Sequence, residues 1–208
     1  MMKRLFIVLI LAVVFLAGTT AWSDNSSLQK AQELNGEVIR LYRLGRYAEA
    51  IPYAEKALTI SEKALGPQHP HTATSLNNLA LLYYTMGIYD KAEPLYRRSL
   101  TISEKVLGPE HPDTATRLNN LAELYRAMGA YGKAEPLYKR SLVIYEKIQG
   151  PEHPDTANSL NNLALLYYTM GAYDKAEPLY RRSLTISEKV QGPEHHDTTT
   201  RLNKLAAL

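Results

Sequence analysis

The sequence repeats itself every 42 residues, and this period limits the folds open to the chain more than any other feature. In each unit a glycine, an asparagine and a Gly-Pro pair recur at this spacing. These are Gly45, Gly87, Gly129 and Gly171; Asn35, Asn77, Asn119, Asn161 and Asn203; and Gly66-Pro67, Gly108-Pro109, Gly150-Pro151 and Gly192-Pro193. A repeat of this length is typical of a solenoid, in which each unit buries its apolar face against its neighbours.

Two of the units are nearly identical, which indicates a recent internal duplication. Residues 65–106 align without a gap with residues 149–190 and differ at five positions, Leu65, Gln68, His71, Thr74 and Ile88. We expect units at about 31–64, 73–106, 115–148 and 157–190, and a partial unit at 199–208. That fragment is interpreted either as a solvating cap helix or as the start of a truncated fifth unit.

Each unit has the pattern of two helices. Leu76, Leu79, Ala80 and Tyr83 are spaced as i, i+3, i+4 and i+7, which predicts a first helix that follows the His-Pro loop and ends at Gly87. We call it helix A. A second apolar pattern runs over residues 89–103 and stops at the next Gly-Pro pair, which predicts a helix B. No segment has the period of a strand, so the predicted fold class is all-α, an α-solenoid of tandem helix-turn-helix units.

The unit resembles the tetratricopeptide repeat. The resemblance rests on the order Leu79, Ala80, Tyr83, Gly87, Tyr89, Ala92, Tyr96 and Ser99, which recurs along the chain. The segments "LNNLA" and "GPEHPDTA" are similar to the repeats of kinesin light chains and their bacterial relatives, and the resemblance covers Leu34 to Leu208. It implies a right-handed superhelix whose helices A line a concave peptide-binding face.

Composition and charge exclude several classes of protein. The chain has no cysteine, so disulfides, thiolate metal sites and a cysteine nucleophile are excluded. The formal net charge is +3, and Lys3 and Arg4 lie in a segment that looks removable. Because the other basic residues alternate with acidic ones, a nucleic-acid partner is disfavoured.

The N-terminal residues have the order of a secretory signal. Two basic residues precede an uninterrupted apolar run at residues 5–17, and a segment with small residues ends at Ser23. We expect residues 1–23 to be a cleaved signal peptide and residues 24–208 to form the exported array, periplasmic or secreted. The alternative is an uncleaved membrane anchor, because Trp22 is a residue type favoured at membrane interfaces.

The side of helix A opposite its apolar stripe is the predicted peptide-binding groove. In the second, third and fourth units its predicted residues are Asn77, Asn78, Tyr84, Asn119, Asn120, Glu123, Arg126, Asn161, Asn162 and Tyr168. An amide both donates and accepts hydrogen bonds, which suits a peptide main chain. The alternative is that these asparagines bridge neighbouring helices.

The chemistry of the predicted groove changes along the array. Leu81 and Tyr84 become Glu123 and Arg126 in the third unit, then Leu165 and Tyr168 in the fourth. A ligand with apolar side chains on both sides of a charged one would match, unless the differences are drift between duplicated units.

We expect a non-catalytic scaffold that needs no cofactor or metal. No phosphate-binding loop or catalytic triad is present, and the histidines recur one per unit, so capping of helix A is expected for them: His69, His111, His153 and His195. The expected partner is a protein or peptide, not a nucleic acid or small molecule, and membrane contact would involve only the N-terminal segment, if it is uncleaved. The alternatives are a self-assembling array and the accessory region of a longer, truncated protein.

Overall fold

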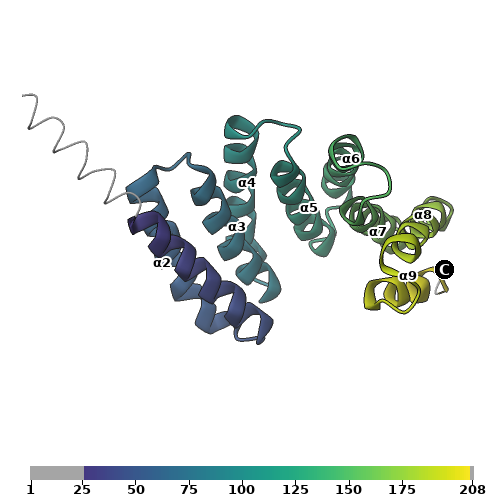
Figure 1. The fold of residues 1–208 in the computed structure, drawn as a ribbon, viewed down its shortest axis with the longest axis horizontal. Coiled ribbons are helices and arrows are strands. Elements are labelled where there is room, and N and C mark those ends of the chain that lie inside the picture. Colours follow the sequence, from purple (N-terminus) through teal and green to yellow (C-terminus); the bar gives the residue numbers. More distant parts are fainter. Residues whose placement is uncertain (1–25, 207–208) are drawn as a thin grey trace, which may run out of the picture.

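The computed structural model describes residues 26–206, and the regular structure of this part is α-helical. A first helix runs through residues 26–43. It is followed by α2 (Tyr47–Leu65), α3 (Pro70–Thr85), α4 (Tyr89–Val106), α5 (Pro112–Ala127), α6 (Tyr131–Ile148), α7 (Pro154–Thr169), α8 (Tyr173–Gln191) and α9 (His196–Ala206). Successive helices form pairs that follow one another along the long axis of the molecule (Figure 1). The all-α solenoid prediction is confirmed.

The ends of each helix A follow from local chemistry. In α3, Pro70 occupies the first turn, where its missing N–H group costs little, and the Nδ1 atom of His69 accepts a 3.1 Å hydrogen bond from the backbone of His71. Gly87 then adopts φ 75°, a left-handed conformation that suits glycine. The Ile88 amide donates to the Tyr83 carbonyl at 2.8 Å, so the chain turns directly into α4.

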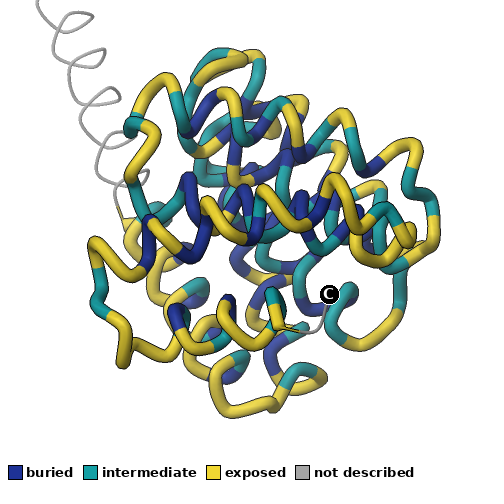
Figure 2. Tube along the Cα trace, turned by 90° about the vertical axis from the view of Figure 1, so that its right-hand side faces the viewer, coloured by how far each residue is buried: buried dark blue, intermediate teal, exposed yellow. Residues whose placement is uncertain are grey.

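Small side chains let the two helices of a unit approach closely. Ala80 and Ala92 are fully buried between α3 and α4. Next to them, the Ser99 hydroxyl donates to the Ala73 carbonyl at 2.6 Å, and its two counterparts do the same in the next two units. Most buried apolar residues therefore belong to one cluster that extends from Val38 to Tyr180. Seen along the array, the buried residues lie toward the inside and the exposed ones toward the outside (Figure 2).

The packing between consecutive units alternates along the chain. Ser61 lies 3.4 Å from Ser75 where α2 meets α3. At the equivalent positions the pairs are Ser103 and Arg117, then Tyr145 and Ser159, then Ser187 and Arg201. Arg117 and Arg201 are nearly fully buried, and Arg201 donates to both Ser187 and Asn158. The Ser–Arg pair therefore recurs after two units and not after one, whereas the other two interfaces have a Ser–Ser pair and a Tyr–Ser pair.

The predicted signal peptide, with Trp22, lies outside the described residues. Within residues 26–206, no helix combines the length and the apolar character that a membrane crossing requires.

Candidate functional site

The ten residues predicted for the groove lie on three helices that follow one another as helix A of their units. Asn77, Asn78 and Tyr84 belong to α3, the next four to α5, and the last three to α7. Helix α5 contacts both α3 and α7. The residues therefore form one line across three neighbouring helices, which we call the helix A row.

The asparagines of the row bond to each other from helix to helix. Asn78 donates from Nδ2 to the Oδ1 atom of Asn35 at 2.9 Å, and Asn120 donates in the same way to Asn77 at 2.9 Å. Only 8% of Asn77 is exposed. The expectation that the Asn77 side chain faces a solvated groove is wrong, because the adjacent helix brings Asn120 against it.

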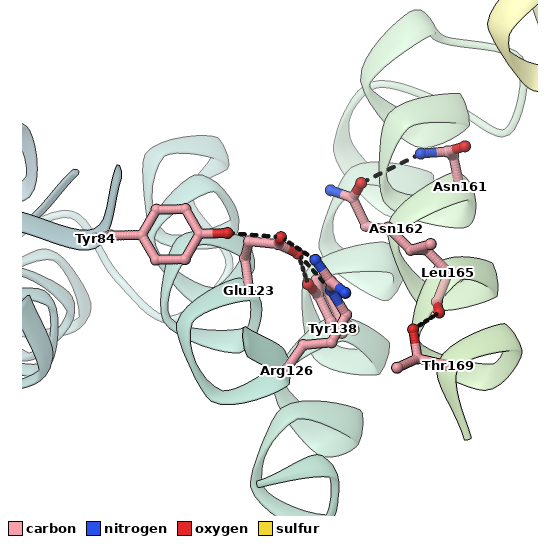
Figure 3. A network of polar contacts seen from close by, with 8 residues as sticks. All are labelled: Tyr84, Glu123, Arg126, Tyr138, Asn161, Asn162, Leu165 and Thr169. Carbon is pink, nitrogen blue, oxygen red and sulfur yellow. Dashed lines mark hydrogen bonds and ion pairs between the residues drawn. The ribbon is translucent and has the colours of Figure 1, made fainter. Parts of the chain in front are cut away.

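The amide series is interrupted between α5 and α7. The Oδ1 atom of Asn119 is buried without a hydrogen-bond partner within the described residues. Its expected donor, Asn162, instead accepts a long 3.4 Å bond from Asn161 on its own helix (Figure 3). Asn161 also accepts from the Lys204 ammonium of α9 at 3.2 Å. The second half of the row thus has an amide oxygen whose bonding capacity is unused.

A carboxylate at the centre of the row accepts hydrogen bonds from three side chains. Glu123 accepts hydrogen bonds from Tyr84 of α3 at 2.9 Å and from Tyr138 of α6 at 2.6 Å. Arg126, one turn further along α5, approaches the same carboxylate to 2.5 Å and 3.0 Å through two nitrogens. Figure 3 shows the four side chains converging from three helices. The sequence predicted three of these residues and missed Tyr138. A tyrosine recurs at this position in other units, as Tyr96 and Tyr180, and this recurrence indicates only a residue of the core.

The surroundings keep Glu123 and Arg126 charged. Burial acts to raise the pKa of Glu123, but hydrogen bonds from Arg126 and Tyr138 outweigh it and leave the pKa below its ordinary value. The hydrogen bond that Arg126 donates to Glu123 raises the pKa of Arg126, while burial raises the pKa values of Tyr84 and Tyr138. The central charges therefore neutralise each other.

The fourth unit presents a different surface. Tyr168 is 36% exposed and Tyr173, at the start of α8, is 51% exposed. Their rings meet edge to face with centroids 5.6 Å apart. Tyr84 and Tyr89 form the equivalent pair in the second unit, but there the Tyr84 hydroxyl is engaged by Glu123. Sequence reasoning missed Tyr173, although its position directly after the helix A to helix B turn was visible.

The recurring histidines cap helices, as predicted. In each of the four connectors the Nδ1 atom accepts a hydrogen bond from the backbone amide two residues later, at 3.1 to 3.2 Å. No group of three potential metal ligands occurs among residues 26–206.

Known proteins share this architecture. The tetratricopeptide repeat model matches residues 35–105, 83–147, 118–189 and 155–208. Two crystal structures of nearly identical repeats from a kinesin light chain-like protein of Podosopora anserina, one of them a point variant, are 27% identical to this chain. They have TM-scores of 0.75 and 0.74, and the match covers 86% of this chain and 85% of theirs.

BtubC (BKLC) from P. vanneervenii has a TM-score of 0.73 over 91% of this chain and 82% of that chain, and its 24% identity shows a common fold. No curated protein matches the chain. Tetratricopeptide arrays generally mediate contacts between proteins, and those of the kinesin light chain type are typically non-catalytic scaffolds. With its family matches spanning residues 35–208, the chain belongs to the tetratricopeptide repeat family.

Proposed function

We propose that the chain is a non-catalytic scaffold that binds an extended peptide or protein segment along the helix A row. The observation that carries the proposal is the change of chemistry along the row. Glu123 and Arg126 satisfy each other at its centre, whereas Tyr168 and Tyr173 remain exposed on the fourth unit. Exposed tyrosines with few rotatable bonds are common anchors in protein interfaces.

The ten residues of the row take different parts in this proposal. Asn77 and Asn120 hold neighbouring helices in register, so their contribution to binding is to keep the row rigid. The Nδ2 groups of Asn119 and Asn162 donate no hydrogen bond within the described residues and are available for a peptide main chain, whereas the Asn119 oxygen is buried. Tyr168 supplies apolar contact, and the centre accepts a ligand residue that can bond to a neutralised ion pair.

We place this activity outside the cytoplasm, in the periplasm or the medium. The support is the leader-like order of residues 1–23, a basic start followed by an apolar run and small residues. Mass spectrometry of protein recovered outside the cytoplasm tests this directly. Cleavage after Ser23 would leave a product without Trp22, whereas a product that retains residue 22 would indicate an anchor or another cleavage site.

A capture experiment followed by matched variants tests the binding proposal. Envelope proteins of the producing cell would be captured on the full chain, and the bound segment would be reduced to a synthetic peptide. We expect Tyr168→Ala to weaken binding of this peptide by about tenfold or more, because one aromatic anchor is lost.

The matched control is Tyr53→Ala on α2, a helix B tyrosine that is 40% exposed. It should leave the affinity unchanged. Equal weakening by both variants, or by neither, would remove the helix A row from the mechanism. Thermal melting of each variant separates a loss of binding from a loss of folding, which matters most for Asn77→Ala because Asn77 joins two helices.

A further inference from the structure

The connector between α2 and α3 lacks the acidic residues of the other three connectors. In those three, an aspartate follows the capping histidine two positions later, as Asp113, Asp155 and Asp197. Before α3 this residue is His71. The residue directly before the capping histidine is a glutamate in the same three, Glu110, Glu152 and Glu194, and Gln68 before α3. The cap of α3 is therefore built without a carboxylate in its own connector.

This cap forms only while His69 is neutral. Its Nδ1 atom accepts the 3.1 Å bond from the backbone amide of His71, so a proton that binds to Nδ1 removes the acceptor. The two imidazole rings are stacked, with centroids 5.3 Å apart and planes 14° from parallel. Protonation of both rings would place like charges face to face at a helix N-terminus, where the helix dipole disfavours cations.

The other connectors offer a protonated histidine a second partner. The Nδ1 atom of His153 lies 3.6 Å from Oδ2 of Asp155, and that of His195 lies 3.9 Å from Oδ2 of Asp197. In α5, Asp113 occupies the first turn in the same way. A proton on such a histidine creates an ion pair where the capping bond is lost, and the aspartate favours the helix dipole. Acid therefore exchanges one contact for another in these connectors and only removes a contact before α3.

The helices around the connector supply no unpaired carboxylate near the cap. The nearby carboxylates are bound by cations, Glu33 by Lys30 in the first helix, Glu62 of α2 by Arg98 of α4, and Glu104 of α4 by Arg140 of α6. The other charged residues on the adjoining turns are Lys63 of α2, Lys105 of α4 and Arg117 of α5. Arg117 reaches Thr74, one turn after His71, at 3.1 Å. The surroundings of the cap therefore disfavour an additional positive charge.

The titration of His69 has the sign that this arrangement requires. Burial lowers its pKa from the ordinary value of 6.5, and the charge of His71 lowers the pKa further. Because the fold favours the neutral ring, the contribution of His69 to stability is present above about pH 6.5 and is lost as pH falls through the folded-state pKa. The loss begins just below neutral pH, before carboxylates with ordinary pKa values take up protons.

The start of α3 also joins the first unit to the second. The Thr72 hydroxyl donates to the Gly66 carbonyl at 2.8 Å and so fixes the connector to the first turn. One turn later, Ser75 accepts a 3.1 Å bond from Asn35 of the first helix and lies 3.4 Å from Ser61 of α2. Fraying of this turn therefore weakens contacts to both helices that precede it.

We propose that the start of α3 is an acid-sensitive joint, at which protonation of His69 and His71 opens the helix cap and loosens the first unit from the rest of the array. The three connectors that have an aspartate stay closed under the same conditions. The joint acts whatever the helix A row binds, because it depends only on contacts within the chain.

Helix α7 is an internal control for α3. The two sequences differ at two positions, His71 against Asp155 and Thr74 against Asn158. Hydrogen–deuterium exchange of the full chain, read by mass spectrometry and corrected for unfolded-chain rates, compares the opening of the two helix starts. We expect the ratio of α3 opening to α7 opening to rise by about fivefold or more from about pH 7.5 to about pH 5.5, the effect of losing one helix cap. A constant ratio would overturn the proposal.

Reciprocal substitutions assign the effect to the two histidines. His71→Asp gives α3 the residue of the other connectors and should abolish the rise, while Asp155→His should confer acid sensitivity on α7. His69→Asn supplies a cap that does not titrate and should also keep α3 closed at about pH 5.5. Each variant is compared with itself at the two pH values, so a uniform loss of stability cancels. A rise that survives either substitution in the α3 connector, or that Asp155→His does not produce in α7, would place the titrating groups elsewhere and exclude this joint.

Discussion

The third unit (α5 and α6) and the fourth unit (α7 and α8) have the same packing and differ in what their helices A offer. In both, a leucine, an alanine and a tyrosine at equivalent positions fill the space between the two helices: Leu118, Ala122 and Tyr125 in one, and Leu160, Ala164 and Tyr167 in the other. On the helix A row, the third unit has the Glu123–Arg126 pair and the fourth has Leu165 and Tyr168.

Charged residues in a repeat do not by themselves make a charged site. Glu123 and Arg126 compensate each other and are held by two tyrosines from neighbouring helices. The centre of the row is therefore rigid and neutral, while the adjacent unit is apolar and more exposed.

Replacement of the central carboxylate should cost the most stability. Glu123→Leu leaves the Arg126 guanidinium and the Tyr84 and Tyr138 hydroxyls without their common acceptor, so we expect a loss of about 2–3 kcal/mol in the free energy of unfolding. Urea unfolding measures it. The double variant Glu123→Leu/Arg126→Tyr reproduces the fourth unit and should recover most of the loss. A double variant as unstable as the single one would contradict this account.

Protonation at low pH should also remove the stabilisation that Glu123 provides, with a smaller loss than the Glu123→Leu substitution. The folded-state pKa of Glu123 lies below its ordinary value of 4.5, so its contribution is fully present above that pH and is lost as pH falls through the folded-state value. The stability difference between the native chain and Glu123→Gln should therefore shrink below about pH 4.5. Other carboxylates with a lowered pKa, such as Glu135, are present in both proteins, so their contributions cancel in the stability difference. A difference that is constant from pH 7 to pH 3 would exclude the mechanism.

Two asparagines at equivalent positions should behave differently. Asn77→Ala removes the acceptor of Asn120 and should cost about 1 kcal/mol, because a half-buried amide donor loses its bond. Asn119→Ala removes an oxygen that has no partner and should cost about 0.5 kcal/mol or less. Thermal melting of the two variants compares them. Equal losses would mean that Asn119 is also bonded in solution.

The smallest effect concerns two tyrosine hydroxyls. Tyr84→Phe loses one of the bonds to Glu123, and since Arg126 and Tyr138 remain, the cost should be about 0.5–1 kcal/mol. Tyr168→Phe removes a hydroxyl from an exposed ring and should leave stability within about 0.5 kcal/mol of the native chain. Denaturant midpoints of the two variants measure both losses of stability. A larger loss for Tyr168→Phe than for Tyr84→Phe would contradict this prediction.

Sequence periodicity predicted the helices and their ends because each end has its own local signal. The His-Pro start of α3 and the glycine after it are visible in sequence and determine the helix limits almost without tertiary help. The capping role of His69 was equally accessible, since the residue recurs directly before the proline of the first helical turn.

The bonding of the row was harder to predict, because it depends on the offset between neighbouring helices. A 42-residue period suggests that Asn77 stands beside Asn119, whereas the structure joins Asn77 to Asn120, 43 residues later. A one-residue offset turns a solvated side chain into a buried bridge. Tyr138 was missed for a related reason, since only the fold brings α6 to the carboxylate of Glu123.

The alternation of the inter-unit contacts has a consequence for how a gene of this kind can change length. Loss of the codons for residues 107–148 would place Ser103 opposite Ser159, a pairing like that of Ser61 and Ser75. Loss of the codons for residues 149–190 would instead place Tyr145 opposite Arg201, two large side chains where the native contacts have one. Loss of a single unit is therefore tolerated at one of these two places in the gene and penalised at the other.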